Sequence, residues 1–245
     1  ISIIVPSTRR CANGIDRTFE GKSEVERRQR ATTHRSLFIE LAKDQDPGVV
    51  YNAFTTLPSE DQAALRWIPR LMLRSTDKFA RGVGLDLIDT VDDSEVFRWI
   101  VPMLDDPDED VRECASTAFR VNLRNPELAF KKRMTYSENL RYELVQLISY
   151  QTQPNREPML RELLRDPSGK VRAWALSSLG SNHPMIGSKP IISVSEVRPF
   201  LNDPYPEVRA NAVMELCCQK APDAKTLVKK ALVDPDRDIR ESAIW

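Results

Sequence analysis

Apolar residues recur with helical spacing along most of the chain, in paired segments that short polar turns separate. Residues three and four positions apart share one face of a helix, so this spacing predicts amphipathic helices. One such pair is made of Leu65, Trp67, Ile68 and Leu71, followed by Phe79, Val83, Leu85, Leu87 and Ile88. Only 8 glycines and 7% aromatic residues accompany the pattern, which disfavours a loop-rich β fold. We therefore predict an all-α chain of successive helical pairs.

A turn followed by a helix recurs from Asp106 to the C-terminal end of the chain. Asp-Pro followed by Val-Arg or Ile-Arg occurs four times, and the Asp always lies six residues before the Arg. The four pairs are Asp106 and Arg112, Asp166 and Arg172, Asp203 and Arg209, and Asp234 and Arg240. Recurrence at one spacing marks a repeat protein.

The Arg position serves as a register marker for the whole chain. The marker positions are Val50, Arg81, Arg112, Arg141, Arg172, Arg209 and Arg240, giving steps of 31, 31, 29, 31, 37 and 31 residues. The Asp six residues earlier becomes Ser75 and Thr135 in two copies, and these residue types also form turns and helix N-caps. The long step reflects an enlarged loop at 181–194, where His183 lies.

The motif Asp-Pro-x-x-x-Val-Arg-x-x-Ala resembles the HEAT repeat over roughly residues 24–245, and Pro158 matches the Pro that bends a first helix in that family. The short period is similar to that of the HEAT-like repeats of phycobilisome lyases. The resemblance implies a right-handed α-solenoid of about seven stacked helical hairpins over 23–245, with an N-terminal extension over 1–22. The chain ends in mid-repeat, so we expect truncation at the C-terminus.

The resemblance also implies roles for the repeated residues. The Asp and Arg of the motif are expected to form a structural ladder along the stack: Asp106, Arg112, Asp166, Arg172, Asp203, Arg209, Asp234 and Arg240. Small residues three after the marker let second helices pack closely: Ala53, Ala115, Ala175, Ala212 and Ala243. Positions one and five after the marker are expected to point outward on the concave face: Glu113, Thr117, Tyr142, Gln146, Ala173, Ser177, Ala210 and Met214.

Charge gives no global direction to function. Lys and Arg number 36 and so do Asp and Glu, so nothing pulls the whole chain toward nucleic acid or a membrane surface. Residues 1–35 are locally basic, with eight Lys or Arg against four Asp or Glu. This segment is interpreted as a solvated extension packed on the first repeat, or as a basic arm that reaches a partner. No apolar run approaches ~18 residues, so we expect no membrane span.

The residues that carry chemistry are sparse. The cysteines form no CxxC pair and are interpreted as free thiols in a reducing, cytoplasmic compartment. The two histidines lie in unrelated repeats, and no zinc signature, GxSxG, Walker or GxGxxG motif occurs. We therefore expect no catalytic residue, cofactor or metal.

The candidate partner-binding residues are positions where the copies disagree, or uncharged positions on the expected concave face: Tyr142, Gln146, Trp174, Tyr205 and Met214. Trp174 either fills a local gap or protrudes as an anchor, and Tyr205 lies in a turn where it could be exposed. Trp67 and Trp99 recur 32 residues apart in matching contexts, which favours packing.

Three functions follow as hypotheses. The first is a non-catalytic scaffold or adaptor that binds a protein or peptide on the concave face. The second is a bilin-lyase-like enzyme or subunit, by the resemblance alone. The third is a HEAT-like DNA-binding protein or glycosylase with Tyr142 and Trp174 near Asp166, which the charge balance disfavours.

Overall fold

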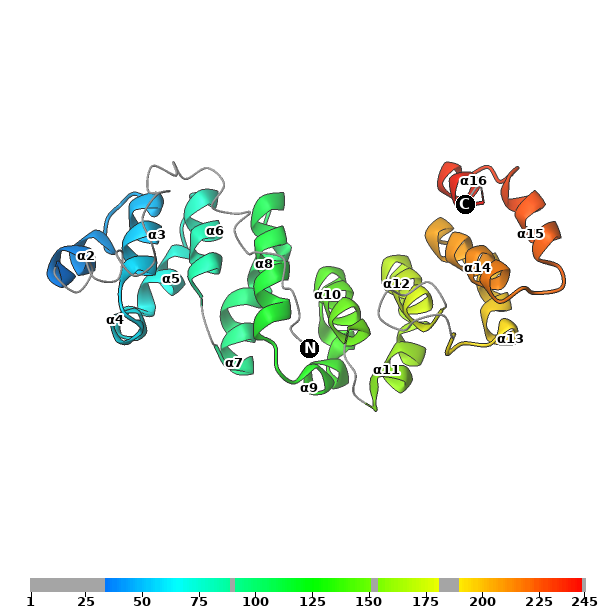
Figure 1. The fold of residues 1–245 in the computed structure, drawn as a ribbon, viewed down its shortest axis with the longest axis horizontal. Coiled ribbons are helices and arrows are strands. Elements are labelled where there is room, and N and C mark those ends of the chain that lie inside the picture. The colour runs from blue at the N-terminus through cyan, green and yellow to red at the C-terminus, as the bar shows by residue number, and fades with distance from the viewer. Residues whose placement is uncertain (1–33, 89–90, 151–153, 181–189, 244–245) are drawn as a thin grey trace. The chain divides into compact units, whose positions relative to one another are not determined.

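The computed structural model describes residues 34–88, 91–150, 154–180 and 190–243. These residues form helices and connecting loops without a strand, so the predicted all-α class is confirmed (Figure 1). The N-terminal extension, His183 and most of the enlarged loop at 181–194 lie outside the described residues. The chain divides into two compact units, the first ending at Asn125 and the second beginning at Pro126.

The first unit pairs first helices with longer second helices. Its first helices are α2 (Arg35–Leu41), α4 (Ser59–Ala64), α5 (Trp67–Met72) and α7 (Asp93–Glu95), the last continuing through a π turn η1 (Val96–Ile100) into a 3-10 turn η2 (Val101–Asp105). Its second helices are α3 (Pro47–Thr56), α6 (Lys78–Leu87) and α8 (Glu109–Asn122). Helix α6 packs between α3 and α8, so the second helices lie side by side.

The second unit repeats this organisation. Its first helices are α9 (Pro126–Lys131) with η3 (Arg133–Thr135), α11 (Arg156–Leu163), α13 (Val194–Val197) with η4 (Arg198–Asn202), and α15 (Ala224–Ala231). Its second helices are α10 (Glu138–Ser149), α12 (Gly169–Leu179), α14 (Pro206–Cys218) and α16 (Arg237–Ser242). Consecutive second helices pack against each other from α10 to α16. The repeat count and the handedness of the stack remain predictions.

Prolines explain where the first helices are irregular. Pro102 and Pro199 both stand at the start of a 3-10 turn that continues the first helix of its repeat. Proline has no N–H to donate, so a regular helical hydrogen bond cannot form there. Pro158 instead lies in the first turn of α11, where no such donor is required.

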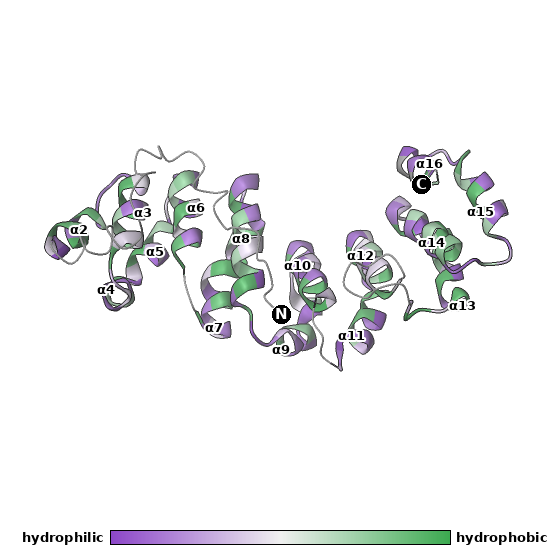
Figure 2. Cartoon of the chain, in the orientation of Figure 1, coloured by the Kyte–Doolittle hydropathy of each residue, from purple (hydrophilic) through white to green (hydrophobic). Residues whose placement is uncertain are grey.

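The core follows the register of the second helices. Ala53, Ala115, Ala175 and Ala212 are at most 2% exposed, which confirms the expected small buried position three residues after the marker. At that position α6 has Gly84, where an added Cβ would lie 2.9 Å from the Pro69 carbonyl oxygen. The helices carry hydrophobic and hydrophilic residues together, as amphipathic packing requires (Figure 2).

Two residues expected on the outer face are instead buried. Ala173 is 1% exposed and Ala210 is 4% exposed, so the outward orientation predicted for them was wrong. The carbonyl of Ala173 accepts a hydrogen bond from Asn211 Nδ2 at 3.0 Å, because α14 packs directly against α12. Ala210 belongs to a small core cluster with Ala231 and Ile239.

The cysteines also depart from expectation at one position. Cys114 is buried on α8 and is disulfide-bonded, so the expected free thiol was wrong there. Cys217 and Cys218 at the end of α14 are free thiols. The compartment therefore stays a prediction.

Candidate functional site

Several marker arginines bind in two directions. Arg172 Nη1 donates to the carbonyls of Asp166 at 2.7 Å and Pro167 at 3.0 Å, in the turn of its own repeat. Its Nε and Nη2 donate to the two carboxylate oxygens of Asp203, in the next repeat, at 2.9 and 2.7 Å. One side chain thus fixes its own turn and the neighbouring repeat.

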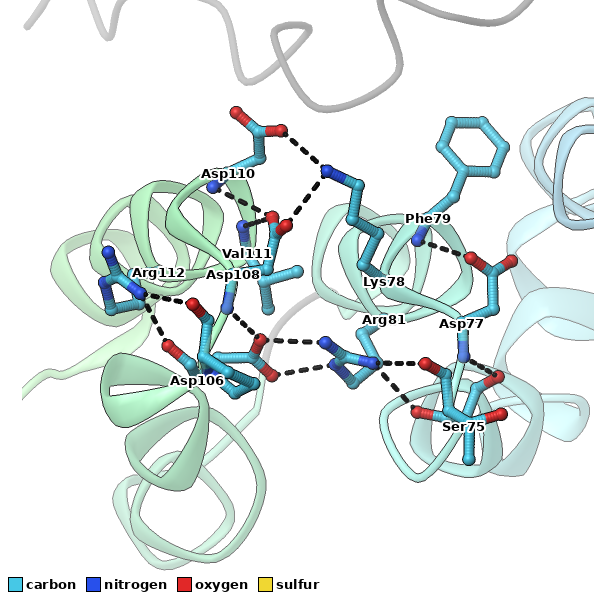
Figure 3. A network of polar contacts seen from close by, with 12 residues as sticks. Ser75, Asp77, Lys78, Phe79, Arg81, Asp106, Asp108, Asp110, Val111 and Arg112 are labelled. Carbon is cyan, nitrogen blue, oxygen red and sulfur yellow. Dashed lines mark hydrogen bonds and ion pairs between the residues drawn. The ribbon is translucent and has the colours of Figure 1, made fainter.

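Other repeats form the same arrangement. Arg81 donates from Nε and Nη2 to Asp106 at 2.7 and 2.8 Å and from Nη1 to the carbonyls of Ser75 and Thr76 (Figure 3). Arg141 Nε approaches Asp166 at 3.0 Å. The pair between Arg209 and Asp234 is longer, at 4.0 Å. Each of these carboxylates therefore meets the Arg of the preceding repeat.

The Asp residues also close the turns in which they lie. Oδ1 of Asp106, Asp166 and Asp203 accepts a hydrogen bond from the backbone N–H two residues later, at 2.8 to 3.0 Å. Ser75 Oγ accepts the equivalent bond from Asp77 at 3.1 Å. The helix N-cap is then the residue that donates this N–H, as at Asp77 in α6. The serine therefore preserves the turn but provides no charge for the ladder.

Burial and pairing oppose each other at the ladder carboxylates. Burial raises the pKa of Asp203, but hydrogen bonds from Arg172 and from the Tyr205 N–H outweigh it, so the net pKa is lowered. Asp106 follows the same balance, with burial opposed by Arg81 and the Asp108 N–H. Both carboxylates are therefore held ionised against their partners. Arg81, Arg141 and Arg172 are engaged by these pairs and do not form a free phosphate-binding row.

An aromatic pair joins α10 and α12 in the second unit. The rings of Tyr142 and Trp174 meet edge to face, with centroids 5.9 Å apart and an interplanar angle of 79°. Trp174 Nε1 donates to Ser149 Oγ at 3.2 Å. Both residues are half-buried. Trp174 thus fills the space beside α10. Asn211 occupies the same position, two residues after its marker, and likewise contacts the preceding second helix.

A buried polar network lies at the C-terminal ends of α10 and α12. Ser149 and Ser178 lie with their hydroxyl oxygens 2.7 Å apart. Arg156, at the start of α11, donates from Nε to the Ser149 carbonyl and from Nη2 to the Ser178 carbonyl, both at 2.9 Å. Burial lowers the pKa of Arg156. The arginine satisfies carbonyls that the ends of the two helices would otherwise leave without donors.

The remaining candidate residues are distributed along the same second helices. Gln146 on α10 and Met214 on α14 are half-buried, as is Ser177 on α12. Tyr205 is half-buried at the start of α14 and packs on Gly169, where an added Cβ would lie 2.1 Å from Tyr205 Cγ. Tyr205 therefore packs between two turns, and its register position differs from those of Tyr142 and Trp174.

The expectation that the repeated tryptophans both pack was wrong for one of them. Trp67 on α5 is 49% exposed. Trp99 is half-buried, and the guanidinium groups of Arg74 and Arg98 lie 5.1 and 5.3 Å from its ring centroid. Trp67 and Trp99 therefore have different surroundings although their sequence contexts match.

Two residues that the sequence patterns did not indicate have unusual surroundings. One is Arg156, described above. The other is Asp86 on α6, whose Oδ2 is buried and has no hydrogen-bond partner among the residues that the structure describes. Its signal in the sequence is a lone carboxylate between Leu85 and Leu87 in an otherwise apolar run.

No group of three or more His, Cys, Asp or Glu side chains in the described residues is placed to hold a metal ion. In that same part of the chain, no helix is both long and apolar enough to cross a membrane.

Comparison with known proteins gives structural likeness only. No family model and no curated protein matches the chain. Among solved structures, YibA of E. coli matches with a TM-score of 0.36 and 18% identity, over 91% of this chain and 85% of that one. A designed armadillo repeat protein in complex with the peptide (KR)4 matches with a TM-score of 0.28 and 17% identity, over 85% and 95%. Likeness at this level decides neither family nor function.

Proposed function

We propose that this protein is a non-catalytic helical-repeat scaffold or adaptor that binds a protein or peptide partner on its second helices. The observation that carries the proposal is a row of uncharged, half-buried side chains on three adjacent second helices of the second unit, α10, α12 and α14. The row consists of Tyr142, Gln146, Trp174, Ser177, Asn211 and Met214. We call these six residues the uncharged row.

The chemistry of the uncharged row suits a protein surface. It combines two large aromatic rings, a thioether and several amide or hydroxyl groups, and interface cores are enriched in aromatic residues and Met and depleted of charge. The nearby cations Arg141 and Arg172 are occupied by Asp166 and Asp203. A nucleic-acid backbone would instead require free cations along the surface.

The glycosylase hypothesis depends on a carboxylate near the aromatic pair. Asp166 was the candidate, but it is 4% exposed, paired with Arg141 and bonded to the Ser168 N–H. A carboxylate engaged in this way supports a turn and a ladder pair. The bilin-lyase hypothesis has no support from a described residue, and an absorbance titration with bilin tests it directly.

The proposal is tested by placing charge on the uncharged row. Gln146→Arg with Ser177→Arg puts two cations on half-buried positions of α10 and α12. The matched control, Leu128→Arg with Thr226→Arg, puts two cations on exposed positions of the first helices α9 and α15. Affinity purification followed by mass spectrometry identifies the protein partner, and its affinity for each variant is measured by calorimetry.

We expect the row variant to bind the partner at least tenfold more weakly than the parent, which corresponds to about 1.4 kcal/mol of binding free energy. The control variant should bind the partner with the affinity of the parent. Circular dichroism establishes that both variants fold. Equal binding by both variants would exclude the uncharged row as the partner site. A salt-sensitive gel shift with DNA, unaffected by the control, would favour the nucleic-acid hypothesis instead.

A further inference from the structure

Two exposed apolar side chains lie one turn apart on α5. Trp67 is 49% exposed and Leu71 is 59% exposed. Residues four positions apart in a helix are neighbours on its surface, so these two side chains form one apolar patch. Ile68 and Pro69, which lie between them in the sequence, are instead buried. The patch therefore lies on the face of α5 that points away from the core of the first unit.

Two arginines connect this face of α5 to the first helix of the next repeat. Arg70 and Arg74 each follow one member of the patch by three residues, and the Arg74 N–H donates to the Leu71 carbonyl at 3.0 Å, so the helical turn continues to it. Arg70 Nη2 donates to the carboxylate of Glu95 on α7. The guanidinium of Arg74 lies over the ring of Trp99 in η1. The apolar patch and the surroundings of Trp99 are therefore adjoining parts of one surface.

Two guanidinium groups are held at the Trp99 ring. Those of Arg74 and Arg98 lie 5.1 and 5.3 Å from the ring centroid. Both arginines are exposed, and neither has an ion-pair partner among the residues that the structure describes. A guanidinium that stacks on an indole keeps N–H groups that can bind a carboxylate, and its rotamer freedom is already reduced. Trp99 therefore holds two available cations in place.

The carboxylates near these cations in the sequence are engaged elsewhere. Neither α5 nor η1 contains a carboxylate. On α7, Glu95 pairs with Arg70, and Asp92 accepts the Glu95 N–H as the helix N-cap. Asp93 accepts two backbone N–H groups just after α8. Positive charge therefore predominates on α5 and η1, beside the apolar patch.

We propose that Trp67, Leu71, Arg74, Arg98 and Trp99 form a second docking surface, which binds an acidic peptide segment that carries an apolar side chain. We call these five residues the Trp–Arg surface. Its charge selects a segment of the opposite sign, and an exposed indole beside a leucine suits an apolar anchor. The carboxylates of the segment would pair with the two arginines. This surface belongs to first helices of the first unit and shares no residue with the uncharged row.

Single-stranded nucleic acid and a membrane surface fit these residues less well. Nucleic acid stacks successive bases on aromatic rings, but two guanidinium groups already lie at the Trp99 ring. Membrane-surface helices bury a large apolar face, whereas the six-residue α5 exposes two apolar side chains on this face. An acidic peptide needs only one apolar contact and two ion pairs.

The probe is a fluorescein-labelled peptide, Glu-Glu-Phe-Glu-Glu-Leu-Glu-Glu, and the control peptide has glutamine in place of each glutamate. Fluorescence anisotropy measures the binding of both peptides to the full chain. We expect the glutamate peptide to bind at least tenfold more tightly than the glutamine peptide, because only the first is charged. Raising NaCl from about 50 mM to about 500 mM should remove most of this difference.

Two double variants test the two parts of the surface, and circular dichroism establishes that each of them folds. Trp67→Ala with Leu71→Ala, and separately Arg74→Gln with Arg98→Gln, should each weaken binding of the glutamate peptide at least tenfold. Their matched controls alter exposed residues of the second unit, and both should bind the peptide with the affinity of the parent. The controls are Met134→Ala with Val233→Ala and Lys132→Gln with Arg165→Gln.

Three results would overturn the proposal. The first is equal binding of the glutamate peptide by the parent and both surface variants. The second is equal binding of the glutamate and glutamine peptides by the parent. The third is failure of the parent to bind the peptide while it binds oligothymidylate, or vesicles that contain phosphatidylserine, in a way that the surface variants abolish. That result would assign the Trp–Arg surface to nucleic acid or to a membrane.

Discussion

At the scale of single residues, the ladder arginines differ in how closely they pair with the next repeat and in how buried the paired carboxylate is. Arg172 and Arg209 make equivalent bonds to the carbonyls of their own turns. They differ toward the next repeat, where Arg172 lies 2.7 Å from Asp203 and Arg209 lies 4.0 Å from Asp234. Asp203 has a 9% exposed side chain and Asp234 a 24% exposed one. The two positions therefore form a matched pair for measuring one ladder contact.

We expect Arg172→Met to lower the free energy of unfolding by about 3 kcal/mol, because it leaves a buried carboxylate without its counter-charge. Arg209→Met should lower the free energy of unfolding by only about 1 kcal/mol, near the value of an exposed ion pair. Urea unfolding measures both. The double variant Arg172→Met with Asp203→Asn should recover part of the loss, since the buried charge is removed as well. Equal losses at the two positions would contradict the assigned role.

At the scale of helices, Arg156 joins two ends that lie far apart in sequence. Arg156→Met removes the donors to the Ser149 and Ser178 carbonyls while keeping an apolar stem. We expect a loss of roughly 2 kcal/mol, the range for hydrogen bonds to charged groups. Amide exchange should accelerate at the C-terminal turns of α10 and α12 together. Arg165→Met, at an exposed arginine just after α11, should leave exchange at both ends unchanged.

Helix positions and turn chemistry could be predicted from the sequence, because they depend on neighbours a few residues away. At each of the four Asp-Pro motifs the turn is followed by a helix as the motif predicts, namely α8, α12, α14 and α16. The surroundings of Trp67 and Trp99 could not be predicted in this way. Arg74 lies over Trp99, whereas its equivalent in the preceding repeat, Lys43, binds Glu40.

Contacts between repeats were equally hard to infer for the candidate site. Ala173 and Ala210 are buried because the next second helix covers them, which a register measured along one helix does not reveal. The six-residue spacing of Asp166 and Arg172 does not by itself show which group each side chain binds. Arg172 donates to the Asp166 carbonyl in its own turn and pairs its charge with the Asp203 carboxylate of the next repeat. Asp86 escaped notice because its burial depends on the elements packed around α6.

At the scale of the whole molecule, two kinds of carboxylate give stability opposite dependences on pH. Asp106 and Asp203 have lowered pKa values in the fold, so their contribution is present above about pH 4 and is lost as pH falls through the folded pKa. Asp86 has a pKa raised to about 7, so the fold binds its proton more tightly than the unfolded chain does. Stability from Asp86 is therefore lost as pH rises from about 4 to 7.

We expect Asp86→Asn to raise the free energy of unfolding by roughly 1 to 3 kcal/mol near neutral pH and to change it little near about pH 4, because the amide carries no charge to desolvate. Thermal unfolding across this range measures the effect. Glu60→Gln, at an exposed carboxylate on α4, is the control and should leave the pH profile unchanged. A parent whose stability rises steadily toward neutral pH, with no gain from the amide, would show that the Asp86 carboxylate has a counter-charge.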